Sequence, residues 1–252
     1  MQGLAVLACG LFLAADPDRA RALLREERIA EALREIQSTM RASPNDPEIQ
    51  YEAGTLLREL GAKRAARLEE LAPDSAEVHE LIGRSLETRG KLEEALAAYR
   101  AALSKDPQRV GVHALVGNVL WKQRDLSDAK AEMERELNIN PSHSVANLRL
   151  GQILLSMNQP REAAAHLRAA VHADSSSTET HLALGKACRA LDDLPGALKE
   201  FRLVAERRPN DTTAHAQLAA VYRAMGDQTR SKAESEILRQ LLQRSAEAGR
   251  TQ

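Results

Sequence analysis

The chain has 252 residues, with 35 basic and 36 acidic side chains and a net charge of −1 at pH 7. This balance excludes a strongly basic nucleic-acid interface and a basic face for an anionic membrane. Aromatic residues make up 2% of the chain, and its two isolated cysteines, Cys9 and Cys188, provide neither a disulfide framework nor a metal-site spacing. The abundance of Ala, Leu, Glu and Arg favours helices throughout.

The first fifteen residues differ from the rest. Residues 4–15 form an uncharged apolar run, which as a helix would span roughly 18 Å against roughly 30 Å for a bilayer core, so it is too short to cross a membrane. The run matches the apolar part of a secretory signal, and residues 6–9 resemble a bacterial lipobox with Cys9 as the lipidated residue. Both patterns normally have a Lys or Arg before the apolar run, and none is present here. Residues 1–15 are therefore expected to serve export or lipid anchoring, with an apolar helix packed on the next segment as the alternative.

Two irregular segments follow. In residues 16–46, Ala32 and Ile36 mark the second helix of a pair whose first helix is weakly patterned. Residues 47–75 are five residues shorter than the later segments, because only 12 positions separate Gly61 from Pro73. We therefore predict that a turn at Gly61 precedes a shortened second helix over residues 62–71.

Residues 76–109 show the regular pattern. Apolar residues recur at helical spacing up to Leu86, Gly90 interrupts them, and a second apolar stripe runs from Leu92 until Pro107 closes the segment. The pattern continues in residues 110–143, 144–177 and 178–211. Residues 212–248 end the array with Ser231 at a position usually held by Ala, followed by a long polar helix expected to cap the stack.

Two columns of small residues establish the repeat. Glycines recur 29, 34, 34 and 34 residues apart, at Gly54, Gly83, Gly117, Gly151 and Gly185. Alanines recur every 34 residues, at Ala95, Ala129, Ala163 and Ala197. A glycine inside a helix costs about 1 kcal/mol relative to alanine. Its recurrence predicts that the second helix of each pair approaches the first closely at the alanine position.

These columns, with a large apolar residue four positions after each Ala and a closing Pro, resemble the tetratricopeptide repeat. The resemblance covers residues 18–245 and implies an all-α, right-handed superhelical α-solenoid of antiparallel helix pairs over residues 16–252. It also implies a non-enzymatic scaffold that binds another protein.

The resemblance further implies that the first helices line a concave groove. The groove positions in the middle of the chain combine amides, apolar side chains and cations: Asn118, Trp121, Lys122, Leu148, Gln152, Leu155, Leu182, Lys186 and Arg189. Amides can pair with a peptide backbone, and an apolar stripe can accept side chains or a helix face. The expected partner is a peptide segment or amphipathic helix of another protein. The alternative is that these side chains only pack on neighbouring helices.

A column of histidines invites a metal hypothesis. His79, His113, His181 and His215 follow the repeat, with Asn147 in the remaining place. Packed helices lie about 8–10 Å apart, whereas zinc requires ligand nitrogens at about 2.1 Å. We expect these rings to pack against adjacent helices, and we expect no metal, no other cofactor and no nucleic acid to bind.

No catalytic motif accompanies the repeats. A phosphate loop, a nucleophile elbow and a His-Glu-x-x-His helix are all absent from the sequence, so no enzymatic activity is expected. The predicted function is an exported, periplasmic or lipid-anchored scaffold that assists an assembly in the bacterial envelope. A cytoplasmic adaptor or co-chaperone is the alternative, and the regulatory region of an enzyme is a weaker third.

Overall fold

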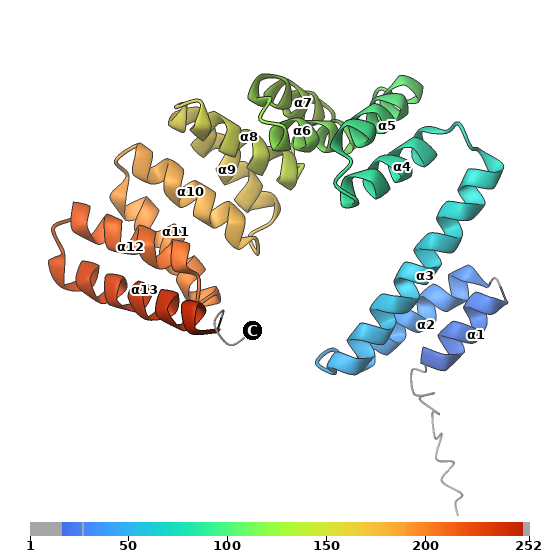
Figure 1. The fold of residues 1–252 in the computed structure, drawn as a ribbon, viewed down its shortest axis with the longest axis horizontal. Helices are drawn as coiled ribbons and strands as arrows, with labels where there is room; N and C mark the ends of the chain where they lie inside the picture. The colour runs from blue at the N-terminus through green and yellow to red at the C-terminus, as the bar shows by residue number, and fades with distance from the viewer. Residues whose placement is uncertain (1–16, 27, 249–252) are drawn as a thin grey trace, which may run out of the picture. The chain divides into compact units, whose positions relative to one another are not determined.

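In the computed structural model, which describes residues 17–26 and 28–248, thirteen helices follow one another and those residues form no strand (Figure 1). The helices are α1 (Pro17–Arg25), α2 (Ile29–Ala42), α3 (Pro47–Leu71), α4 (Ala76–Thr88), α5 (Leu92–Lys105), α6 (Val112–Lys122), α7 (Leu126–Ile139), α8 (Ser144–Ser156), α9 (Pro160–Ala173), α10 (Thr178–Ala190), α11 (Leu194–Arg207), α12 (Thr212–Ala224) and α13 (Gln228–Ala248). This confirms the predicted all-α solenoid of helix pairs. The predictions for residues 1–15 lie outside the described residues.

The chain divides into two compact units, residues 1–81 and residues 82–252, and the division falls within α4. In the first unit, α1, α2 and α3 pack around one apolar cluster. Its buried members are Ala20, Leu23, Leu24, Ala32, Ile36, Ala53, Leu56 and Leu60. Lys63 fastens α3 to α1, because its ammonium group donates to the backbone carbonyl of Leu24 at 2.8 Å. The irregular first segment therefore does form a helix pair, with a first helix of 9 residues.

The prediction of a turn at Gly61 is wrong. Helix α3 runs without interruption through Gly61 for 25 residues, and Gly61 has no positive φ angle. A regular pair such as α8 and α9 contains helices of 13 and 14 residues. Since α3 is almost as long as both together, the shortening removed the connection between the two helices. It did not remove a large part of the second helix.

The loss of that connection leaves the second half of α3 without a partner in its own segment. In the regular segments the chain reverses at a residue with positive φ, and these residues are spaced by 34: Gly90, Arg124, Asn158, Asp192 and Gly226. Side chains along residues 61–71 are mostly exposed, and Leu71 is 67% exposed. Without a reversal, the second half of α3 cannot fold back over the first, and the regular repeat of hairpins is interrupted here.

In the second unit, each regular segment is an antiparallel helix hairpin. The alanine column lies at the contact between its two helices, and all four of its side chains are completely buried. The glycine column faces the large residue of the second helix. A Cβ atom added at Gly83 or Gly185 would lie 2.5 Å from the ring of Tyr99 or Phe201, respectively. The glycines are therefore needed for close helix approach, as predicted.

Side-chain caps fix where several of these helices begin. Asp125, Ser177, Asp193 and Asp211 each accept a hydrogen bond from the backbone N–H group three residues later. Such a cap satisfies an N–H group that has no partner within the helix.

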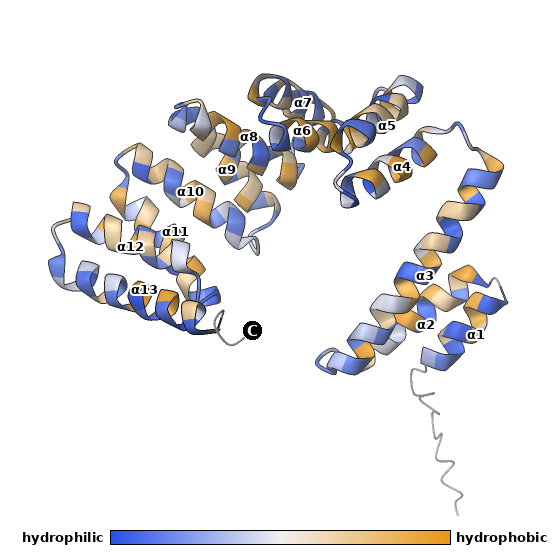
Figure 2. Cartoon of the chain, in the orientation of Figure 1, coloured by the Kyte–Doolittle hydropathy of each residue, from blue (hydrophilic) through white to orange (hydrophobic). Residues whose placement is uncertain are grey.

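The last hairpin, α12 with α13, closes the array with a variation of the small-residue columns. Ser231 replaces the usual alanine, is buried, and donates from its hydroxyl group to the carbonyl of Ala219 at 2.9 Å. Most side chains of α13 are exposed, and hydrophilic residues recur along it in Figure 2. Within residues 17–26 and 28–248, no helix combines the length and the apolar character needed to span a bilayer.

Candidate functional site

The predicted groove residues lie on three successive first helices, α6, α8 and α10. These residues, together with the other exposed and half-buried side chains on the same side of α6, α8, α10 and α12, are called the first-helix face. Asn118, Trp121, Gln152, Leu155 and Leu182 are half-buried, and the cations Lys122, Lys186 and Arg189 are exposed. Leu148 is only 7% exposed and offers little surface to a partner. The face is therefore more polar than the expected apolar stripe.

Arg149 on α8 organises the centre of this face. Its guanidinium carbon lies 4.5 Å from the centre of the Trp121 ring, within the range of a cation–π contact. Its Nε atom donates to Oδ1 of Asn118 at 3.1 Å. Its Nη1 atom donates to Oε1 of Gln152 at 2.7 Å and to Oε1 of Glu179 at 3.0 Å. A single side chain thereby connects α6, α8 and α10.

The amides are partly used by this network. Gln152 donates from Nε2 to the same Glu179 oxygen at 3.0 Å. Nδ2 of Asn118 makes no hydrogen bond within the part of the chain that the structure describes. One amide donor thus remains beside Trp121 for a ligand.

Sequence reasoning missed Arg149. The signal was its place in the 34-residue column, where Leu81, Leu115 and Ala183 are apolar. A single arginine in a largely apolar column is unusual and could have been recognised. Its partners could not, because they come from helices about 30 residues away in sequence on each side.

The positive charges of the face are distributed unevenly. Lys122 on α6 is neutralised by Glu87, whose Oε1 lies 2.6 Å from the lysine Nζ atom. Lys186 and Arg189 on α10 and Arg223 on α12 are exposed and make no ion pair within the described residues. The α10–α12 end of the face therefore carries three free cations.

Three of the four column histidines form a repeated structural pair, whereas Nε2 of His79 lies 3.0 Å from Oδ1 of Asp74. Nδ1 of each ring lies 2.6, 2.5 and 2.7 Å from a glutamate oxygen nineteen residues later, in the pairs His113–Glu132, His181–Glu200 and His215–Glu234. Nε2 of the same rings lies 3.2, 3.1 and 2.9 Å from the backbone carbonyls of Pro107, Ser175 and Pro209. Each ring therefore lies between a carboxylate of the second helix and a backbone carbonyl of the preceding loop.

These contacts account for the rings without a metal. They join the two helices of a hairpin to the loop that precedes it, in keeping with the expected packing against adjacent helices. Within the described ranges 17–26 and 28–248, no group of three His, Cys, Asp or Glu side chains is placed to hold a metal ion.

One hairpin contains a neutral version of the pair. Asn147 replaces the histidine, and its Oδ1 atom lies 3.0 Å from Nδ1 of His166, which stands at the glutamate position. Nδ2 of Asn147 donates to the carbonyl of Pro141 at 2.9 Å. Burial lowers the pKa of His166 below its ordinary value of 6.5. The amide acceptor suits a neutral ring.

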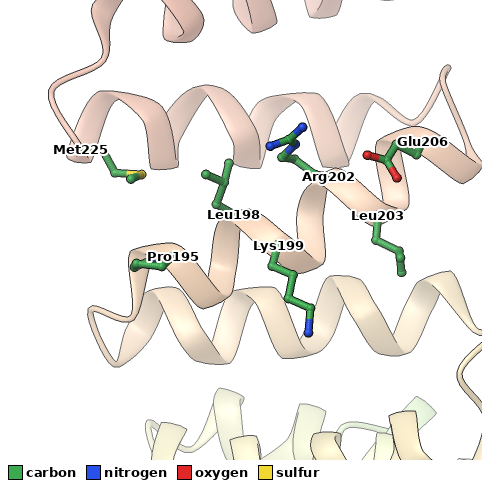
Figure 3. Close-up of a pocket in the computed structure, with 7 residues that line it drawn as sticks. All are labelled: Pro195, Leu198, Lys199, Arg202, Leu203, Glu206 and Met225. Atoms are coloured by element: carbon green, nitrogen blue, oxygen red, sulfur yellow. The ribbon is translucent and has the colours of Figure 1, made fainter.

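A shallow pocket lies on the other helix layer. Pro195, Leu198, Lys199, Arg202, Leu203 and Glu206 of α11 line it together with Met225, which caps the C-terminal end of α12 (Figure 3). Its volume is about 450 Å³. We call it the α11 pocket, and none of its residues belongs to the predicted groove.

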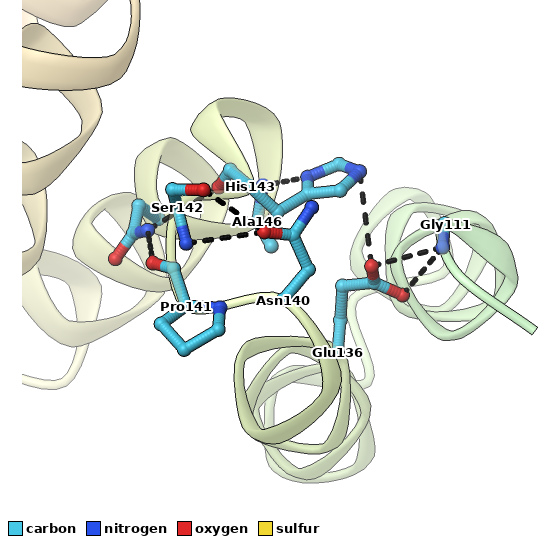
Figure 4. A network of polar contacts seen from close by, with 8 residues as sticks. Gly111, Glu136, Asn140, Pro141, Ser142, His143 and Ala146 are labelled. Atoms are coloured by element: carbon cyan, nitrogen blue, oxygen red, sulfur yellow. Dashed lines mark hydrogen bonds and ion pairs between the residues drawn. The ribbon is translucent and has the colours of Figure 1, made fainter. Parts of the chain in front are cut away.

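A buried carboxylate joins two hairpins near the centre of the second unit (Figure 4). Glu136 on α7 is completely buried at a column position where the neighbouring hairpins carry Ala102 and Ala170. Both of its oxygens accept from the backbone N–H group of Gly111, at 2.9 Å. Its Oε1 atom lies 3.9 Å from Nε2 of His143, whose Nδ1 atom accepts from the N–H group of Ala146 at the start of α8. Because Gly111 and His143 precede the first residues of α6 and α8, this network joins the starts of both helices to α7.

Cys188 is buried on α10. Burial raises the pKa of its thiol to about 11. The thiol is therefore protonated at neutral pH and is a packing group of low reactivity.

Family models decide the classification. A model described as tetratricopeptide repeat matches residues 18–72 and 148–212, and one described as TPR repeat matches residues 83–123, together more than half of the chain. The chain belongs to the tetratricopeptide repeat family. Among curated proteins, none matches this tetratricopeptide repeat chain.

Solved structures share the tetratricopeptide repeat fold. YrrB, described as a TPR protein with an unusual peptide-binding site, is 22% identical with a TM-score of 0.63, over 70% of this chain and 91% of YrrB. MamA from Desulfovibrio magneticus is 21% identical with a TM-score of 0.62, over 67% of this chain and 95% of MamA. A tetratricopeptide repeat protein from Parabacteroides merdae is 17% identical with a TM-score of 0.54, over 87% of this chain and 75% of its own. At these identities the likeness establishes the fold alone.

Proposed function

We propose that this tetratricopeptide repeat protein is a non-enzymatic scaffold that binds a peptide segment or an amphipathic helix of another protein on the first-helix face. The observation that carries the proposal is the arrangement at Trp121. The only tryptophan of the chain lies half-buried beneath Arg149, and the free amide donor of Asn118 lies beside it. Tryptophan and arginine are the residue types most often responsible for binding energy at protein interfaces.

The charges of the face define the partner further. Lys186, Arg189 and Arg223 lack carboxylate partners within the described residues, so a bound segment gains most when its acidic residues lie over α10 and α12. Its apolar residues then lie near Trp121 and Leu155 on α6 and α8. The peptide-binding site attributed to YrrB supports this class of ligand, and members of the family generally act as scaffolds for other proteins.

The test uses peptides selected from a random library for binding to residues 17–252. Binding is measured by fluorescence anisotropy for the parent, for Trp121→Ala, and for Tyr51→Ala, a control that removes an exposed aromatic residue from α3 in the other unit. We expect Trp121→Ala to weaken binding at least tenfold and Tyr51→Ala to leave it unchanged. Equal affinities for the parent and Trp121→Ala would remove the first-helix face from the proposal.

We also propose that the scaffold acts outside the cytoplasm, in bacterial envelope assembly. The support is the sequence of residues 1–15, with its apolar run and the lipobox-like residues 6–9. We expect cell fractionation to find the parent protein associated with the membrane. Metabolic labelling with palmitate should show lipidation of the parent and its loss in Cys9→Ser. Unlabelled parent protein found entirely in the cytoplasmic fraction would favour the alternative, a cytoplasmic adaptor or co-chaperone.

A further inference from the structure

The α11 pocket combines exposed apolar surface with free positive charge. Leu198 and Leu203 line the pocket and are half-buried, and Met225 is 47% exposed. Lys199 and Arg202 are exposed and make no hydrogen bond or ion pair within the described residues. Figure 3 shows Arg202 on the α12 side of α11 and Lys199 on the opposite side, so the two cations lie on either side of the apolar residues that line the pocket.

The pocket is not a regular feature of the repeat. At the position of Lys199, the preceding second helices carry Ala97, Ala131 and Ala165, each one repeat apart. Leu203 likewise replaces Ala169 of α9. Repeat packing requires neither a lysine nor a leucine at these positions, because α9 carries alanine at both.

Two of the carboxylates nearest in sequence to the two cations are engaged elsewhere. Glu200, the acidic neighbour of Lys199 in sequence, is buried against His181 at 2.5 Å. Asp193 accepts from the N–H group of Gly196 at the start of α11. Glu206 is the one acidic side chain of the pocket and lies near the C-terminal end of α11. The pocket is therefore positively charged around Lys199 and Arg202 and negatively charged near the C-terminal end of α11, at Glu206.

We propose that the α11 pocket is a second docking surface, which binds an acidic amphipathic segment of another protein. A volume of about 450 Å³ is within the range that accepts a few ligand side chains. One or two large apolar side chains of the segment pack on Leu198, Leu203 and Met225, and the thioether of Met225 adapts to their shape. Flanking carboxylates pair with Lys199 and Arg202, and a basic residue beyond them faces Glu206, which fixes the direction of the segment.

This surface is separate from the first-helix face, because the pocket is built mainly on a second helix. A chain with both surfaces can hold two segments at once. The inference does not depend on the proposed function, since either surface can bind when the other does not.

The experiment uses residues 17–252 with 13C-methyl-labelled methionine, in which the Met225 methyl signal is assigned from Met225→Leu. The probe is a synthetic amphipathic helix whose Glu residues flank two Leu residues, and its counterpart has Lys in place of every Glu. The acidic helix should shift the Met225 signal saturably at low ionic strength and at least tenfold more weakly in 0.5 M salt, because screening weakens exposed charge pairs. The basic helix should leave the signal unchanged.

The decisive comparison uses two matched charge reversals. Lys199→Glu with Arg202→Glu changes the pocket, whereas Lys186→Glu with Arg189→Glu makes the same change at the same spacing on α10. The first variant should bind the acidic helix at least tenfold more weakly, and the second should retain the Met225 shift. If the acidic helix instead perturbs only Trp121 fluorescence, or if the pocket reversal leaves the Met225 shift intact, the proposal is wrong. Should the pocket reversal lose helicity, Lys199→Ala with Arg202→Ala takes its place under the same criteria.

Discussion

Single glycine positions differ in how much room their surroundings leave. Added Cβ atoms at Gly83, Gly151 and Gly185 would each lie 2.5 Å from a side-chain carbon of the paired helix. At Gly117 the nearest atom, at 2.9 Å, is the flexible methyl group of Met133. At Gly54 no such atom lies within 4 Å. One sequence column therefore contains positions with opposite responses to substitution.

Gly185→Ala should destabilise the second unit by about 1–3 kcal/mol, because the new methyl group overlaps the ring of Phe201. Gly54→Ala is the matched control and should stabilise the first unit by up to about 1 kcal/mol, since alanine favours the helix and nothing obstructs it. Urea unfolding followed by circular dichroism measures both. A large residue at Gly117 should also disrupt its hairpin, and unchanged melting of such a variant would contradict the register of the repeat.

His166 provides a prediction for pH. Its pKa is lowered in the folded state by burial, so the unfolded chain binds the proton first as the pH falls. The contribution of the neutral ring to stability is thus present above pH 6.5 and is lost as the pH falls below that value. His166→Gln should lose less stability than the parent between pH 7.5 and pH 5.5, as measured by urea unfolding at each pH. Parallel losses would show that His166 titrates alike in both states.

At this scale the sequence predicted packing better than polar contacts. The close approach of the helices at the glycine and alanine columns followed from spacing alone, because repeats place equivalent side chains in equivalent environments. The Arg149 network did not, since each of its bonds reaches a different helix and depends on one residue that breaks its column. The burial of Leu148 was also missed, because a position that faces a groove in an idealised repeat can be covered by its neighbours.

At the scale of elements, α3 shows how a deletion changes a repeat. The sequence shows that the segment over residues 47–75 is five residues short, but not which part is missing. A helix ends where a reversal is encoded, and in the regular hairpins that reversal follows a positive φ angle at Gly90 and its equivalents. Three of these are Arg124, Asn158 and Asp192, which composition alone does not identify as left-handed positions. Gly61 has the right residue type but lies in a helix.

Gly61 and Gly90 therefore form a matched pair. Gly61→Ala should stabilise the first unit by about 1 kcal/mol, because alanine is the better helix former and no atom outside the helix lies within 4 Å. Gly90→Ala should destabilise the second unit by about 1 kcal/mol, because alanine is strained at a φ of 75°. Thermal unfolding measures both changes. If Gly61→Ala destabilised the protein, a chain reversal at Gly61 would have to be reconsidered.

Glu136 allows a test of how adjacent hairpins are joined. Glu136→Ala restores the residue that the neighbouring hairpins use, yet it leaves the N–H group of Gly111 without its acceptor and should cost about 1–3 kcal/mol. Glu136→Gln keeps one acceptor oxygen and should cost less. Urea unfolding monitored by Trp121 fluorescence compares the two. A more stable Glu136→Ala variant would show that burying the carboxylate outweighs its hydrogen bonds.

At the scale of the whole molecule, the two compact units have separate cores. The cluster around Leu24 and Ile36 belongs to the first unit, whereas Trp121 lies in the second. In repeat proteins stability is the sum of local terms and contacts between neighbours, so an interrupted array need not unfold in one step. The regular helix hairpins were predicted from the sequence, whereas the interruption followed only from the structure of α3.

Leu24→Ala should lower the stability of the first unit by about 2–5 kcal/mol, because it removes a completely buried side chain. Far-ultraviolet circular dichroism should then show an earlier first transition, while the unfolding midpoint reported by Trp121 stays unchanged. Equal shifts of both signals would mean that the units unfold together.

The His–Glu pairs have a consequence for how this molecule can change in length. Each ring and its carboxylate nineteen positions later lie within one segment, and the carbonyl six positions before the ring lies at the end of the preceding segment. Insertion or excision of one whole 34-residue block therefore keeps each ring with its carboxylate and leaves an equivalent carbonyl six positions before the ring. Such insertions or deletions leave the contacts of the ring unchanged and alter packing only at the new junctions. Duplication of a segment therefore reproduces the His–Glu pair with it.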